Sequence, residues 1–195
     1  MKNGVEKKSE EIINSSQLIK VFLDTNVIFA YLNNNNNFHL EAKASLDALR
    51  LKKNVWIIVS YLTMGELISH RNLMKKGACS VQNALDLFDK FLAGFERNLF
   101  GGPALNQDTI AKNYKKHSRH KSFIKAGFTD FLLLTQAEEI KNVRILTCDK
   151  KMHHCGKTIF GNRIYYLPNQ SPGIRSDYPR LMAEIQNNFM HYSYS

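Results

Sequence analysis

The chain has few cysteines, and its three thiols are too scattered to form a disulfide framework. Cys79, Cys148 and Cys155 are the only cysteines among 195 residues. Because small disulfide-stapled scaffolds carry more cysteines at regular spacings, we interpret these three as reduced thiols of a cytoplasmic protein. A chain of this length buries roughly 70% of its unfolded surface and needs no such staples to fold.

Long apolar runs are also missing. No stretch approaches the roughly 18 apolar residues that a membrane-spanning helix requires, and we expect no membrane association. Residues 1–16 contain no apolar core followed by a small-residue cleavage site. We therefore expect a flexible, charged lead-in at this end and not a secretory signal.

Acidic residues are in the minority. The 17 Asp and Glu residues stand against 27 Lys and Arg residues, which gives a net charge of +10. A surface this basic attracts polyanions such as nucleic acids. Charge alone does not separate a nucleic-acid-binding protein from the many basic proteins that bind none, so the placement of the charge matters more.

Short β-branched runs alternate with longer helical patterns along the chain. The predicted strands are Leu18–Leu23, Val55–Val59, Val143–Leu146 and Arg163–Leu167. Apolar spacings of three and four residues predict helices at about 38–53, 61–76, 80–95, 105–118 and 129–141, with a last helix around Leu181–Ile185. This alternation predicts an α/β fold in which helices cover both faces of a parallel sheet.

Four acidic residues lie at or near the ends of these elements. They are Asp24, Glu66, Asp130 and Asp149. Ligands of open α/β sheets bind beyond the carboxyl ends of the strands, and the strand assignment puts Asp24, Glu66 and Asp149 at that edge. For the helix that begins at Asp130 and feeds the third strand, we expect a start at the opposite edge unless a long connection carries it back.

Each acid also has a purely structural interpretation. Asp24 fits the cap of a following helix, Asp130 fits a helix dipole, and Asp149 fits a turn. Glu66 taken alone fits a solvated helix position. Together they indicate more, because clustered carboxylates repel one another and a site with several of them normally holds a divalent cation.

Four segments of the chain resemble the PIN-domain family of nucleases. They are Val21-Phe-Leu-Asp-Thr-Asn-Val-Ile28, Ser60-Tyr-Leu-Thr-Met-Gly-Glu-Leu67, Thr129-Asp-Phe-Leu-Leu-Leu-Thr-Gln-Ala137 and Arg144-Ile-Leu-Thr-Cys-Asp-Lys150. The most specific features are the apolar strand that ends in Asp-Thr-Asn and the later strand that ends in Thr-x-Asp. In this order the segments span about residues 18–167.

The resemblance implies a three-layer α/β/α sandwich with a central parallel sheet. It implies a nuclease domain over residues 17–170 and a C-terminal extension over 171–195. The chain is longer than the small toxins of the toxin–antitoxin branch, because it carries a helical and basic insertion at about 77–127. An antitoxin-type protein partner and a homodimer are further expectations from the resemblance.

The resemblance also implies that the four acids line one metal site for Mg²⁺ or Mn²⁺. Asp24, Asp130 and Asp149 would be metal ligands, and Glu66 would orient an attacking water or act as a base. Thr147 and Asn26 match residues that support the ligands. Hydrolysis of a phosphodiester at such a site would leave a 5′-phosphate and a 3′-hydroxyl.

A basic stretch with no acidic residue, Lys112–Lys125, precedes Asp130. Its Lys and Arg residues are candidate contacts to RNA, single-stranded or structured, and Tyr114 and Phe123 could stack on bases. The candidates are Lys112, Lys115, Lys116, Arg119, Lys121 and Lys125. The alternative is a solvated helix face, which is the usual role of a charge run.

Two other functions compete with a metal-dependent ribonuclease. One is a non-catalytic, PIN-like module that binds nucleic acid in an RNA-processing assembly, although its acid set would then have no need to be intact. The other is a phosphatase with Asp24 as nucleophile. Haloacid-dehalogenase-type phosphatases require a second Asp two residues later, where this chain has Asn26.

Four side chains within eight residues could suggest structural zinc. They are Cys148, His153, His154 and Cys155. We predict that they bind none, because zinc sites usually use paired ligands on a tight knuckle that converge on one point.

Overall fold

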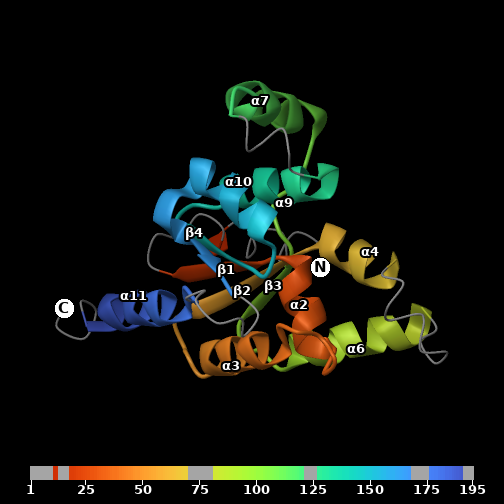
Figure 1. Cartoon of the computed structure of the whole chain (residues 1–195), viewed down its shortest axis with the longest axis vertical. Helices are drawn as coiled ribbons and strands as arrows, with labels where there is room; N and C mark the ends of the chain where they lie inside the picture. The colour runs from red at the N-terminus through yellow and green to blue at the C-terminus, as the bar shows by residue number, and fades with distance from the viewer. Residues whose placement is uncertain (1–10, 13–17, 70–80, 121–126, 168–175, 191–195) are drawn as a thin grey trace.

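The computed structural model describes residues 11–12, 18–69, 81–120, 127–167 and 176–190. A five-stranded sheet with the order β3-β2-β1-β4-β5 forms its centre, and every neighbouring pair of strands is parallel (Figure 1). The strands are β1 (Ile19–Leu23), β2 (Val55–Ser60), β3 (Asn98–Gly101), β4 (Val143–Thr147) and β5 (Ile164–Tyr166). The predicted α/β fold with a parallel sheet is confirmed.

Alternation of side chains along the strands divides the core into two halves. Val21 and Leu23 belong to one buried cluster, whereas Phe22 and Ile58 belong to the other. Successive residues of a strand point to opposite faces of the sheet, so both faces are apolar and both must be covered. The continuous apolar runs of the sequence reflect this double burial.

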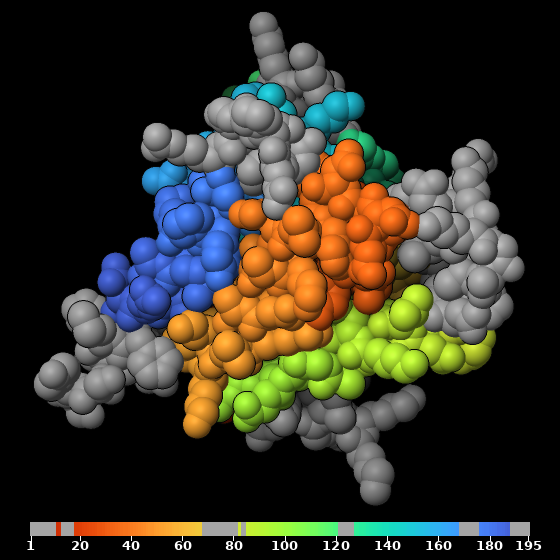
Figure 2. Space-filling view, turned by 60° about the horizontal axis from the view of Figure 1, so that its bottom comes forward, coloured from red at the N-terminus to blue at the C-terminus, as the bar shows by residue number. Residues whose placement is uncertain are grey.

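Helices supply the two outer layers (Figure 1). The helices are α2 (Thr25–Leu32), α3 (His39–Arg50), α4 (Tyr61–Ser69), α6 (Val81–Ala93), α7 (Gln107–His117), α9 (Phe128–Glu138), α10 (Lys150–Phe160) and α11 (Tyr178–Met190). One layer contains α9 and α10, with α7 outside them, and the other contains α2, α3, α6 and α11. Figure 2 shows the outer surface of the second layer, where α3 (orange) lies between α11 (blue) and α6 (yellow-green).

One strand was missing from the prediction. β3 has only four residues and is followed directly by Gly102 and Pro103. It pairs with one edge of β2 and is largely half-buried, so its sequence lacks the long apolar run that marks the central strands. Gly101 ends it at a φ of 119°, and the ring of Tyr61 occupies the space that a Cβ would need.

The helix predictions agree in type but not in extent. The helix expected at 61–76 is described only as far as Ser69, because residues 70–80 lie outside the described part of the chain. The helix expected at 129–141 starts one residue earlier, at Phe128, and ends at Glu138. Helices α2 and α10, which follow strand ends directly, were not delimited from periodicity.

The expected position of Asp130 was wrong. A crossover helix between parallel strands begins at the carboxyl edge of the sheet and returns to the amino edge, where the next strand starts. Helix α9 feeds β4 in this manner, and Asp130 in its first turn lies close enough to Asp149 and Glu66 for their charges to raise its pKa. No long connection is required to bring Asp130 to the other three acids.

The C-terminal helix α11 is part of the packed structure. Leu181 and Ile185 are almost fully buried in the same cluster as β1 and α2. Arg144 on β4 and Tyr165 on β5 both hydrogen-bond to Glu184 of this helix. In the described part of the chain, no helix is long and apolar enough to cross a membrane.

Candidate active site

Four carboxylates meet at the carboxyl edge of the sheet, and we call them the carboxylate site: Asp24, Glu66, Asp130 and Asp149. Asp24 follows β1, Asp149 follows β4, and Glu66 lies on α4 directly after β2. Their proximity is visible electrostatically, because the charges of the other three acids all raise the pKa of Asp24. The parallel topology produces this meeting, since every strand of the sheet ends at the same edge.

Asp24 is the buried centre of the site. Only 1% of its surface is exposed, and its Oδ2 accepts hydrogen bonds from Thr147 Oγ1 at 2.6 Å and from Asn26 Nδ2 at 3.4 Å. Asp24 occupies the N-cap position of α2, but its side chain makes no capping hydrogen bond. The structural interpretation of Asp24 as a helix cap is therefore wrong.

Burial and like charge act together on Asp24. Burial is the largest influence on the pKa of its carboxyl group, and the charges of the neighbouring acids act in the same direction, because an anion beside other anions is disfavoured. Together they raise the pKa to about 7, although the hydrogen bond from Thr147 lowers it. The arrangement is costly without a counter-charge, which indicates a role other than stability.

Glu66 is held in place by the residue that follows Asp24. Thr25 Oγ1 donates a short hydrogen bond to Glu66 Oε2, and Thr63 lies 3.4 Å from the same hydroxyl. Thr25 and Thr63 are both buried, whereas Glu66 is half-buried. Helix α4 is thereby tied to the start of α2, and the Glu66 side chain is oriented at the edge of the sheet.

Asp130 and Asp149 each use one carboxylate oxygen to accept hydrogen bonds from backbone N–H groups at the N-terminal end of a helix. Asp130 Oδ2 accepts from Gly127 N at 3.2 Å, and Asp149 Oδ1 accepts from Lys151 N at 2.6 Å and Met152 N at 3.0 Å. Asp130 thus lies in the first turn of α9, as its interpretation from the helix dipole implies, whereas Asp149 is the N-cap of α10 and not a simple turn residue. The pKa of Asp130 is nevertheless raised, mainly by burial and then by the charge of Asp149.

Comparison with known proteins gives the family. The model of the PIN domain family matches residues 21–157, which include all four carboxylates. The chain belongs to the PIN-domain family. The match agrees with the observed three-layer fold around a parallel sheet.

Two solved structures resemble this PIN domain, each at 18% sequence identity and a TM-score of 0.49. One is the crystal structure of VapBC2 from Rickettsia felis bound to a DNA fragment from their promoter, with 70% of this chain and 93% of that chain covered. The other is a domain of a functionally unknown protein from Methanocaldococcus jannaschii DSM 2661, with 80% of this chain and 96% of that one covered. No curated protein matches the chain.

The donor set of the PIN domain suits a hard cation. All candidate ligands at the carboxylate site are carboxylate oxygens, the donors that Mg²⁺ and Mn²⁺ prefer. Within the described residues, no group of three or more His, Cys, Asp or Glu side chains is arranged so that it could hold a metal ion. Mg²⁺ still suits the carboxylate site, because it keeps several waters and takes only one or two carboxylates directly.

The basic stretch is only partly described. Lys112, Lys115, Lys116 and Arg119 are exposed on or just after α7, whereas Lys121 and Lys125 lie outside the described residues, as does Phe123. Lys116 forms an ion pair with Glu138 on α9, and His117 hydrogen-bonds to the same carboxylate. Lys116 therefore has a structural partner as well as a position on the surface.

Sequence reasoning missed two residues at the site. Thr25 orients Glu66, and the positive charge of Lys151 lowers the pKa of Asp130 against the influence of burial. Thr25 is the middle residue of the Asp-Thr-Asn segment, so its place next to Asp24 was the available signal. Nothing in the sequence connects Lys151 to Asp130, because the two lie on separate helices.

Proposed function

We propose that this PIN domain is a ribonuclease that depends on Mg²⁺ or Mn²⁺ and hydrolyses phosphodiester bonds. The observation that carries the proposal is the state of Asp24. Its carboxylate is buried, is not used as a helix cap and is surrounded by three further acids. Such an accumulation of negative charge is explained by binding of a cation.

Asp24, Asp130 and Asp149 would hold the metal. A bound Mg²⁺ or Mn²⁺ would stabilise charge on the phosphate and lower the pKa of a water. Thr147 and Asn26 hydrogen-bond to Asp24 Oδ2, so Oδ1 would be the oxygen available to a metal. Asp149 Oδ1 caps α10, and its Oδ2 would be the oxygen directed at the metal. Hydrogen bonds of this kind fix ligand orientation and tune affinity.

Glu66 would receive the proton of the attacking water. Thr25 donates a hydrogen bond to Oε2 and thereby orients the carboxylate that would take the proton. In-line attack on phosphorus from the opposite side to the leaving 3′-oxygen would yield a 5′-phosphate and a 3′-hydroxyl. Lys151, whose charge acts on Asp130, would attract a phosphate to the site.

The exposed cations of the basic stretch would capture the substrate. Helix α7 packs on α9, the helix that carries Asp130, and the rings of Tyr114 and Phe131 meet at 6.0 Å. Lys112, Lys115 and Arg119 are thereby attached to an element of the carboxylate site. Contacts of this type bind the phosphate backbone without reading its sequence.

The experiment that tests the proposal compares labelled substrates and metals. Single-stranded RNA, hairpin RNA and single-stranded DNA of one sequence would be incubated with the purified chain in Mg²⁺, Mn²⁺ or EDTA. We expect RNA cleavage that requires metal and is lost in Asp24→Asn and Asp130→Asn. The matched control is Asp89→Asn, an exposed acid on α6 that should retain full activity.

Two outcomes would contradict the proposal. Tight RNA binding without cleavage in any metal would support the non-catalytic, nucleic-acid-binding module instead. Full activity of either purified site variant would remove the assignment of these acids. The homodimer, an antitoxin-type partner and a cytoplasmic location stay predictions and enter no step of the mechanism.

A further inference from the structure

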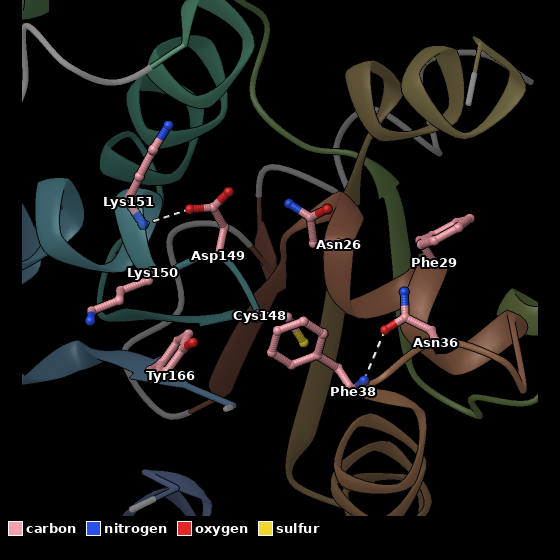
Figure 3. A pocket seen from close by; sticks show the side chains of 9 residues that line it. All are labelled: Asn26, Phe29, Asn36, Phe38, Cys148, Asp149, Lys150, Lys151 and Tyr166. Carbon is pink, nitrogen blue, oxygen red and sulfur yellow. Dashed lines mark hydrogen bonds between the residues drawn. The ribbon is translucent and has the colours of Figure 1, made fainter. Parts of the chain in front are cut away.

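A cavity of about 510 Å³ opens beside the carboxylate site. Asp149 and Asn26 form the side nearest the site, and Phe38 and Tyr166 supply aromatic walls (Figure 3). Because Asn26 also hydrogen-bonds to Asp24, the cavity and the carboxylates share a wall. Its volume falls within the range of pockets that enclose small organic ligands, which is roughly 300–1,000 Å³.

The asparagine-rich loop between α2 and α3 builds one wall. Asn36 Oδ1 accepts from Phe38 N at 2.9 Å, and Asn33 Oδ1 accepts from Asn35 N at 3.1 Å. These local turns, in which Asn side chains replace backbone partners, set the loop in one conformation. The five asparagines at 33–37 thus form a polar turn, and the loop carries Asn36 and Phe38 to the cavity.

Tyr166 forms the second aromatic wall and is held by residues that do not line the cavity. The ring of Tyr166 stacks on His153 with centroids 5.4 Å apart, and its backbone N–H donates to Asp177 at 3.0 Å. Lys150, at the first position of α10, lies beside it (Figure 3). The two aromatic walls are thus held independently, one by the α2–α3 loop and one by β5.

The cavity presents both a hydrogen-bond donor and a hydrogen-bond acceptor. Asn36 uses its Oδ1 within the loop, which leaves the Nδ2 group as the donor for a ligand. Asn26 uses its Nδ2 on Asp24, which leaves Oδ1 as the acceptor. A ligand with flat faces and an edge of mixed donors and acceptors matches such a cavity, and a nucleobase has this chemistry.

We propose that this cavity binds one unpaired nucleobase of the substrate strand, next to the phosphate that is cleaved. The inference rests on the proposed function and narrows its substrate. A base can enter a pocket and present its faces to aromatic rings only when it is unstacked and unpaired. The cleaved bond would therefore lie in a single strand or a loop and not within a duplex.

The first experiment measures binding and needs no catalysis. The four nucleoside 5′-monophosphates and ribose 5-phosphate would be titrated into the full chain by calorimetry in Mg²⁺. Because base stacking on an aromatic ring corresponds to about a tenfold gain or more, we expect at least one nucleotide to bind about tenfold tighter than ribose 5-phosphate. Phe38→Ala and Tyr166→Ala should remove that preference.

The controls separate the cavity from general effects. Tyr61→Ala removes an aromatic ring that is 61% exposed at the start of α4, outside the cavity, and should keep the preference. Phe38→Leu retains apolar volume without the flat ring, so it serves if the alanine variant fails to fold, and it should also lose the preference. Equal binding of ribose 5-phosphate and all nucleotides to the unchanged chain would overturn the inference.

A second experiment separates failure of the inference from failure of the proposed function. RNA with an abasic site beside the mapped cleavage position should be cleaved with a kcat/KM at least about tenfold lower than that of the intact strand. Unchanged cleavage of the abasic RNA would refute the inference alone and leave the nuclease standing. Base preference in calorimetry without cleavage of any RNA would refute the nuclease alone.

A free nucleotide is the other source of the same base chemistry. If nucleoside monophosphates bind with a base preference while abasic RNA is cleaved normally, the cavity would serve a free nucleotide and not the strand. That combination would contradict the inference as stated.

Discussion

Thr147 Oγ1 donates a 2.6 Å hydrogen bond to Asp24 Oδ2, although the two residues are 123 positions apart. The same hydroxyl accepts from Asp149 N at 2.9 Å. Because β1 and β4 are neighbours, their carboxyl ends bring Asp24, Thr147 and Asp149 into one network. This hydrogen bond only partly offsets the cost of burying the Asp24 charge, so the charged carboxylate still destabilises the fold.

Asp24→Asn should stabilise the metal-free protein at alkaline pH. The folded-state pKa of about 7 lies above the ordinary value of 3.8, so the stability of the unsubstituted chain falls as the pH rises from about 4 to about 7. In EDTA at pH 8 the variant should be more stable by at most about 4 kcal/mol, since one pKa unit corresponds to about 1.4 kcal/mol. At pH 4 the difference should vanish. Thermal unfolding across this range measures it.

Metal should narrow that difference in stability. Mg²⁺ or Mn²⁺ that binds only the folded, unsubstituted chain raises its stability and narrows the gap to Asp24→Asn. Asp89→Asn, with an exposed side chain on α6, is the control and should show neither effect. An Asp24→Asn protein that is less stable at every pH, with or without metal, would contradict the assignment of Asp24 as a strained, metal-binding carboxylate.

Asp149→Asn and Asp149→Ala should differ in stability but not in activity. Asn retains the Oδ1 that caps α10, whereas Ala removes the bonds to Lys151 N and Met152 N. Loss of an N-cap costs about 1 kcal/mol, so only the alanine variant should show a lower Tm in EDTA. Both variants should lose metal-dependent cleavage. Equal Tm values would show that the cap contributes nothing here.

The exposed cations of the basic stretch should control the salt dependence of RNA binding. Lys115→Ala with Arg119→Ala should reduce the slope of log affinity against log salt by up to about 1.4, or about 0.7 for each lost phosphate contact with a single strand. Fluorescence anisotropy at several salt concentrations measures this slope. Lys53→Ala with Lys90→Ala removes the same charge from exposed positions elsewhere and should leave the slope unchanged. Identical slopes for both double variants would assign the stretch to a solvated helix face.

Glu184→Gln should weaken the attachment of α11 in a pH-dependent manner. Burial raises the pKa of Glu184, but hydrogen bonds from Tyr165 and Arg144 and nearby positive charges lower it more, so the net shift is downward. The charged form thus contributes stability above pH of about 4.5, which is lost as the pH falls through the lower folded-state pKa. We expect a loss of about 1–2 kcal/mol at pH 7, moderated by solvent exposure of the pair.

Denaturant unfolding of this variant at pH 7 and below pH 4.5 provides the measurement. The difference from the unsubstituted chain should shrink at the lower pH. Glu96→Gln, at an exposed position before β3, should behave like the unsubstituted chain at both values. A loss that stays constant across the two pH values would show that the charge of Glu184 is not responsible.

Elemental analysis should find no stoichiometric zinc. Cys148 packs in the cluster on one face of the sheet and Cys155 in the cluster on the other, so the two thiols cannot converge on one ion without refolding. His153 stacks on Tyr166, and its neighbour His154 points about 100° away around α10. One tightly held zinc per chain that is lost in Cys155→Ser would refute this prediction.

The sequence by itself determined the class of fold and the chemistry of its edge. Doubly apolar strands are a local property of the chain, and strands buried on both faces form a parallel sheet between helix layers. Asp24 and Asp149 terminate such strands, so their meeting at one edge followed from the same pattern. The Asp-Thr-Asn segment added the family resemblance that the PIN-domain match supports.

Only the tertiary structure decided the edge strand, the relative positions of the site residues and the cavity beside them. The edge strand β3 depends on its pairing with β2, because four half-buried residues carry no strong pattern of their own. The positions of Asp130 beside Asp149 and of Thr147 beside Asp24 depend on strand order and crossover direction, which no local periodicity encodes. The cavity joins the α2–α3 loop, the start of α10 and β5, and contacts between such distant segments arise only when the packed layers fix their relative positions.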